Sequence, residues 1–168
     1  MELLYISCYQ FKKSAGTESL PAYGNKFWEK YLDVFSKVHV LGEDIKGYLD
    51  NGTTSLITNP NVQVDIILEN TNPKDFVNDR IIKEIFEKEI LEAEAILIKP
   101  SNRKGMMAIR IAEKYKKPYM VELTGDLNLT LRMHRNVLER MYWPIIHKQI
   151  LKTIKNVPFG LYVTEEYL

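Results

Sequence analysis

The chain has 168 residues, of which 45% are hydrophobic and 27% are charged, a balance typical of an ordinary globular domain with its own core. No apolar run approaches the roughly 20 residues that span a bilayer, which excludes a transmembrane helix in this sequence. The net charge of +1 hides an asymmetry: residues 1–98 carry 10 basic and 16 acidic side chains, whereas residues 99–168 carry 13 basic and 6 acidic ones. The basic half is suited to attract anions, although solvated lysines on helix surfaces explain the same pattern.

The start of the chain predicts a strand rather than a targeting segment, since it has neither the basic residues nor the length of a signal peptide. Cys8 is the only cysteine, so no disulfide can form within the chain. Together these two observations lead us to expect a cytoplasmic protein.

The hydrophobic pattern of the first half predicts three strands and one helix. In chain order the segments are a strand at 2–8, a long polar loop at 9–23, a helix at 25–35, a strand at 38–41, an ambiguous segment at 48–56 and a strand at 62–68. The helix is predicted from an aromatic stripe at helical spacing that includes Phe27, Trp28 and Tyr31.

The second half continues the alternation of helices and strands. Its segments are a turn at 70–75, a helix at 76–93, a strand at 95–98, a helix at 105–115, a strand at 119–123, a helix within 134–154, a strand at 159–163 and the first turn of a helix at 164–168. Pro144 predicts a break or a fresh start in the longest of these helices. This alternation predicts an α/β fold: a doubly wound, mostly parallel, Rossmann-like sheet with helices on both faces. Because the chain stops as a new helix begins, we expect it to be a fragment of a longer protein.

Two buried strands of the second half end in polar loops that contain glycine. The strand at 95–98 leads into Pro-Ser-Asn-Arg-Lys-Gly at 100–105, and the strand at 119–123 ends in Thr-Gly-Asp at 124–126. Ligands of open parallel sheets bind beyond the carboxyl ends of the strands. We therefore expect the functional site in these two loops and in the loop after the first strand.

The first of these loops leads into a helix, whose N-terminus is suited to bind an anion. Ser101 and Asn102 are candidates for phosphate binding, and capping of the helix is their simpler role. Arg103 and Lys104 are candidates for an additional phosphate contact. The sequence contains neither a Walker loop nor a Gly-x-Gly-x-x-Gly motif.

The second loop supplies the candidate for proton transfer. Asp126 follows a strand end and Gly125, so its carboxylate can orient a hydroxyl and accept its proton; capping of the following turn is the alternative. Gly125 itself is a candidate for binding the acceptor or the donor phosphate. His134 is a candidate proton shuttle, although a lone histidine at a helix start is more often structural. His39 and His147 lack supporting neighbours in the sequence. No cluster of histidine, cysteine and acidic residues has metal-ligand spacing, so no metal site is expected.

Three pieces of the sequence together resemble the N-terminal half of a GT-B glycosyltransferase of the family 4 type. They are KPYMVELTGD at 117–126, YVTEEYL at 162–168 and the aromatic helix GNKFWEKYL at 24–32. Members of this family are retaining transferases of bacterial polysaccharide and glycoconjugate synthesis. The resemblance implies that residues 1–168 form one Rossmann-like, acceptor-side domain, and that a C-terminal donor-binding domain lies outside this chain.

The resemblance also implies partners and further site residues. The donor is a nucleotide-sugar shared with the missing domain, the acceptor is a glycan or a lipid-linked hydroxyl compound, and no cofactor is needed. Gly16 allows close approach of the backbone because it lacks a Cβ atom, and with Thr17 it is expected to face the donor phosphates; a surface loop is the alternative. The isolated chain is expected to be inactive.

Other interpretations stay open. The basic helix around 137–155 predicts either peripheral contact with the inner face of a membrane or ordinary packing on the sheet with a solvated basic face. The alternative function is a stand-alone flavodoxin-like module that binds a phosphorylated ligand or partner. Nucleic-acid binding is not expected, because no recognisable motif accompanies the basic charge.

Overall fold

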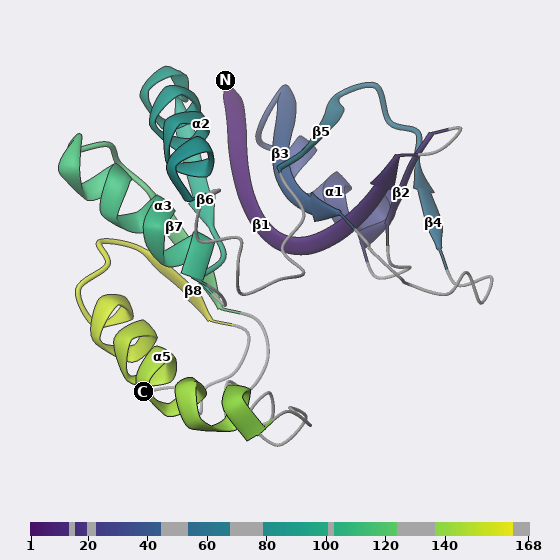
Figure 1. The fold of residues 1–168 in the computed structure, drawn as a ribbon. Helices are drawn as coiled ribbons and strands as arrows, with labels where there is room; N and C mark the ends of the chain where they lie inside the picture. The colour runs from purple at the N-terminus through teal and green to yellow at the C-terminus, as the bar shows by residue number, and fades with distance from the viewer. Residues whose placement is uncertain are drawn as a thin grey trace.

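The computed structural model of the protein describes residues 1–13, 16–19, 23–44, 54–67, 79–100, 103–123 and 137–162. Within these ranges the chain forms strands and helices in alternation, and Figure 1 shows their arrangement. Their bounds in chain order are β1 Glu2–Lys13, β2 Thr17–Ser19, α1 Asn25–Leu32, β3 Lys37–Asp44, β4 Ser55–Ile57, β5 Val62–Ile66, α2 Asp79–Glu92, β6 Ala95–Ile98, α3 Arg103–Lys114, β7 Met120–Leu123, α5 Val137–Ile154 and β8 Gly160–Tyr162.

Six of these strands form a parallel sheet with the spatial order β5-β3-β1-β6-β7-β8. The chain builds the sheet outward from β1 through β3 to β5. It then returns to the other side of β1 and adds β6, β7 and β8. This is the strand order of a doubly wound, Rossmann-like sheet, so the predicted fold class is confirmed.

Helices cover both faces of the sheet, and the alternation of side chains along β1 shows why. Leu4 and Ile6 pack in a core with α2, α3 and α5, whereas Leu3 and Tyr5 pack in a second core with α1. Figure 1 shows α1 on the opposite side of the sheet from the other three helices. The fully buried Trp28 of α1 stacks edge-to-face on Tyr5, with 5.2 Å between the ring centroids. The aromatic stripe predicted from the sequence therefore packs against the sheet.

β1 is longer than predicted and has three neighbouring strands. Its first half lies between β3 and β6, and the register with β3 shifts between Ile6 and Gln10. Its last three residues pair antiparallel with β2, which in turn pairs with β4. The prediction of a polar loop directly after the first strand is wrong, because the buried side chain of Phe11, with polar residues on either side, continues the alternation of a strand.

α5 runs without interruption through Pro144, so the break predicted there is wrong. The bounds of α1, α2 and α3 agree with the prediction to within three residues at each end. The predicted turn at 70–75 and the helical turn at 164–168 lie outside the described residues. In the described part of the chain, none of the helices combines the length and the apolar character that crossing a bilayer requires.

Candidate functional site

The order of the strands reverses between β1 and β6, and open α/β sheets bind ligands beyond the carboxyl ends of the strands at such a point. Ile6 of β1 pairs with Ile98 of β6, and the N–H of Lys99 donates a hydrogen bond to the Ile6 carbonyl at 2.9 Å. We call the polar side chains at this edge of the sheet the carboxyl rim. They lie at or near the ends of β3, β6 and β7 and in the first turn of α3. The carboxyl rim consists of Glu43, Lys99, Arg103, Lys104 and Glu122.

Gly105 lets α3 begin directly against the end of β6. A Cβ atom at this position would lie 2.1 Å from the carbonyl oxygen of Lys99 and 2.8 Å from Cα of Pro100. Both neighbours are backbone atoms and cannot rotate away, so this position requires glycine. The close packing brings the N-terminus of α3, with its partial positive charge, to the carboxyl rim.

A mostly buried ion pair joins α3 to the end of β3. Nζ of Lys104 lies 3.3 Å from Oε1 of Glu43, and the two side chains are only 7% and 15% exposed. Because β1 lies between β3 and β6, this pair reaches across β1, which continues beyond it to Lys13. Removing either partner of such a pair leaves a charge that water hydrates poorly.

Glu122 is the centre of a buried polar cluster on the face of the sheet that α1 covers. Its Oε2 accepts hydrogen bonds from the hydroxyls of Tyr5 at 2.6 Å and Tyr31 at 2.9 Å. Nζ of Lys99 lies 3.8 Å from the same oxygen, and Nζ of Lys30 lies 3.6 Å from Oε1. The side chains of Lys99 and Glu122 are 2% and 1% exposed, so this carboxylate ties β1, α1, β6 and β7 together in the buried part of the carboxyl rim.

Burial and then the charge of Glu122 raise the pKa of Tyr5 well above its usual value, and the same two causes raise the pKa of Tyr31. Both hydroxyls therefore stay protonated and act as donors at neutral pH. The carboxylate of Glu122 accepts from two hydroxyls and lies beside two ammonium groups, so all of these contacts are with side chains of the protein itself. Glu122 is thus suited to positioning rather than to acid–base chemistry.

The structure places four of the predicted site residues. Lys104 is buried in its ion pair with Glu43, which is not the phosphate contact that was predicted for it. Arg103 is the exposed first residue of α3, at the carboxyl rim. Thr17 begins β2 and Gly16 precedes it, so the second half of β1 separates them from the rim; Figure 1 shows β1 curving away from β6 toward β2. The structure thus does not bring these two residues to the end of β6. The remaining candidates lie outside the described residues: Ser101, Asn102, Gly125, Asp126 and His134.

From the sequence, no role at this end of the sheet was expected for Glu43, Tyr5, Tyr31 or Glu122. The available signal was a charged residue inside an apolar strand, since Glu122 interrupts an otherwise hydrophobic segment. An isolated charge in a buried strand indicates that partners exist in the fold, but the sequence does not name them. In the ranges that the structure describes, no group of three histidine, cysteine or acidic side chains is arranged to hold a metal ion.

Comparison with known proteins adds one relative. No family model matches the chain, and no solved structure matches it. The chain is 26% identical to "Protein CapJ" of Staphylococcus aureus over 174 aligned residues, an alignment that covers the whole of this chain and 43% of that protein. The chain thus spans less than half the length of this curated relative. The similarity extends over the whole of this chain.

Proposed function

We propose that this chain is the acceptor-side, N-terminal domain of a retaining glycosyltransferase of the GT-B type, which acts in polysaccharide or glycoconjugate synthesis. The observation that carries the proposal is the carboxyl rim at the switch point of the sheet, where Gly105 brings the N-terminus of α3 against the end of β6. The sequence resemblance to family 4 transferases and the end-to-end similarity to a protein of more than twice this length support it.

In this proposal the acceptor hydroxyl attacks the anomeric carbon of a nucleotide-sugar, which is bound between this domain and a donor-binding domain. The new bond from the acceptor oxygen to carbon forms as the bond to the diphosphate breaks, and the diphosphate leaves with the electron pair. Asp126 orients the hydroxyl and accepts its proton, and His134 relays that proton. Oriented N–H groups of α3 and positive side chains lower the barrier by stabilising charge on the leaving group.

The phosphate contacts are assigned to two places. Ser101, Asn102 and Arg103 bind phosphate at the start of α3, because a helix N-terminus and a guanidinium both favour anions. Gly16 and Thr17 contact the donor from the turn before β2, which requires that the donor reach beyond the rim toward β2. The two tyrosine hydrogen bonds to Glu122 hold the strand ends in place, and proton transfer is assigned to Asp126.

The proposal includes a place in the cell: the cytoplasm, with the acceptor presented at the inner face of the membrane. α5 supports peripheral contact, since Lys148 and Lys152 on the helix and Lys155 just after it are exposed, and Ile145 is 57% exposed. Lysine side chains near an anionic bilayer each contribute about 1 kcal/mol of attraction. The partners are then a nucleotide-sugar and a glycan or lipid-linked acceptor, without nucleic acid.

The test is a transfer assay on the protein as its complete reading frame encodes it, with a panel of nucleotide-sugars and released nucleoside diphosphate as the readout. Asp126→Asn is expected to lower turnover by at least about a hundredfold, as loss of a general base does. The matched control is Asp33→Asn, which removes an exposed carboxylate at the end of α1 beside the amino ends of the strands. Equal turnover in the two variants would contradict the assigned role. Binding of a phosphorylated ligand by the 168 residues alone, with no transfer by the complete protein, would instead favour the flavodoxin-like module.

A further inference from the structure

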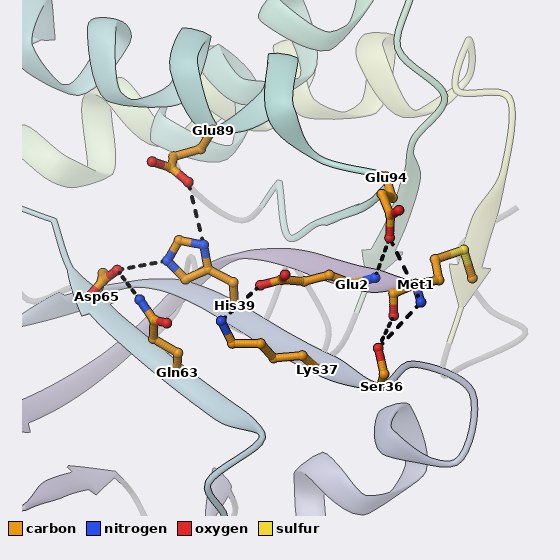
Figure 2. Close-up of polar contacts among 9 residues, drawn as sticks. All are labelled: Met1, Glu2, Ser36, Lys37, His39, Gln63, Asp65, Glu89 and Glu94. Carbon is orange, nitrogen blue, oxygen red and sulfur yellow. Dashed lines mark hydrogen bonds and ion pairs between the residues drawn. The ribbon is translucent and has the colours of Figure 1, made fainter.

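His39 lies between two carboxylates that belong to different elements. Its ring is on the face of β3 that α2 covers, next to Leu4 of β1 in the register of the sheet. Nε2 lies 2.8 Å from Oδ2 of Asp65 on β5, and Nδ1 lies 3.5 Å from Oε2 of Glu89 on α2. The ring is 15% exposed, and Figure 2 shows it between the two acidic side chains. His39 does have supporting neighbours, which the sequence alone did not reveal.

This geometry depends on the protonation of the ring. A neutral imidazole carries one N–H donor and one lone pair, so in either tautomer one of its nitrogens presents a lone pair to a carboxylate. Only the imidazolium can donate to Asp65 and Glu89 at the same time. Histidine is also the side chain whose charge ordinarily changes between about pH 5 and pH 8.

The groups around the ring come from each element packed against it. On the β5 side, Gln63 donates to Asp65 at 3.0 Å, and Lys13 of β1 lies 3.6 Å from the other oxygen of that carboxylate. Although partial burial acts to raise it, hydrogen bonds from His39 and Gln63 hold the pKa of Asp65 below its usual value. Asp65 therefore stays charged through the range in which histidine titrates.

On the α2 side, Nζ of Lys88 lies 3.4 Å from the second oxygen of Glu89. Next to the ring is a cavity of about 380 Å³ near the amino ends of β1 and β6. Its lining is acidic and includes Glu2, Leu4, His39, Glu89, Glu92, Ala93 and Glu94. Within this set Glu2 is paired with Lys37 at 3.4 Å, and Glu94 lies 3.9 Å from the N-terminal ammonium. In the part of the chain that the structure describes, these two pairs lie among the amino ends of the strands, whereas the contacts of His39 join the sheet to α2.

We propose that His39 is a pH-sensitive link between the sheet and α2. The protonated ring bridges Asp65 and Glu89 and holds the C-terminal half of α2 over the cavity. Deprotonation removes the charge that attracts both carboxylates and leaves at most the hydrogen bond to Asp65, which lies within the sheet, so this half of α2 then separates from the sheet more often. Because α2 leads directly into β6, the link acts on the element that positions Lys99. The proposal does not depend on the enzymatic function proposed above.

Amide hydrogen exchange of the complete chain tests the link. The measured quantity is the protection of Ile90 in α2, corrected for intrinsic exchange and divided by the protection of Val121 in β7. In the wild type this ratio is expected to fall about fivefold from about pH 5.5 to about pH 8, the size expected for loss of one partly exposed ion pair worth about 1 kcal/mol. NMR of the imidazole nitrogens follows the ring charge over the same range.

Two variants and one control decide the outcome. In both His39→Gln and Glu89→Gln the ratio is expected to stay constant with pH. The first variant has no imidazole to titrate, and in the second the uncharged carboxamide can contact either form of the ring. Glu84→Gln removes an exposed acid of α2 that pairs with Arg80, and it should behave as the wild type does. A fivefold fall in Glu89→Gln would overturn the proposal even if His39→Gln failed to fold. A constant ratio in the wild type, while the ring changes charge, would overturn it as well.

Discussion

Gly105→Ala is the sharpest test of how α3 meets the sheet. The added methyl group would lie 2.1 Å from a backbone oxygen, more than 1 Å inside ordinary van der Waals contact, so the start of α3 must move away from β6. Overpacking of this kind destabilises a protein by about 1–3 kcal/mol, while alanine regains up to about 1 kcal/mol of helix propensity. Because the clash is with backbone atoms that cannot rotate away, the upper end of that cost applies, and we expect a net loss of about 2 kcal/mol in the free energy of unfolding. For a chain of this length, that lowers Tm by about 4–8 °C.

Thermal and urea denaturation followed by circular dichroism measure this loss. Gly16→Ala is the matched control, because the same methyl group there would lie 3.4 Å from Cδ2 of Leu56, which is ordinary contact with a movable side chain. Its stability should stay within about 0.5 kcal/mol of the wild type. A Gly105→Ala variant as stable as this control would refute the close packing of α3 on β6.

Two further predictions concern the buried charges. The pKa of Tyr5 and of Tyr31 is raised in the folded protein, so the contribution of these hydroxyls to stability is complete below about pH 10 and falls as the pH rises above it. Urea midpoints measured from about pH 8 to about pH 11.5 should therefore fall at the alkaline end. In Tyr5→Phe this fall should be less steep. For the pair at the rim, Lys104→Met alone should destabilise by about 3 kcal/mol because it leaves Glu43 poorly solvated, whereas the double variant with Glu43→Leu should recover most of that loss. A double-mutant cycle with a coupling energy near zero would contradict the second prediction.

The β6–α3–β7 unit could be predicted from the sequence because its signals are local. Ala95–Ile98 is a short apolar run before a proline, and the helix that follows has a clear 3.6-residue pattern. Features set by distant contacts escaped prediction. Phe11 reads as part of a loop until the sheet supplies its buried environment, and α5 continues through Pro144 although a proline in isolation predicts a break.

The position of the candidate site could likewise be predicted from the sequence, whereas the partners of its side chains could not. The position of the site at the carboxyl ends of the strands follows from strand order, and it could be predicted before any side chain was placed. The partners of Glu122 could not, because Tyr5 and Tyr31 are 117 and 91 residues away in the sequence. Only the fold brings these hydroxyls to one carboxylate, and the same holds for the two acids that flank His39.

The central position of β1 has a consequence for how the chain reaches its native state. Leu3 pairs with Val38, 35 residues away, on one side and with Ala95, 92 residues away, on the other. A nascent chain can form the pairing of β1 with β3 early, but the pairing of β1 with β6 can form only after β6 has left the ribosome. During that interval an apolar strand edge is open to other chains, so yield in the cell should depend on translation speed and chaperones as much as on the final stability.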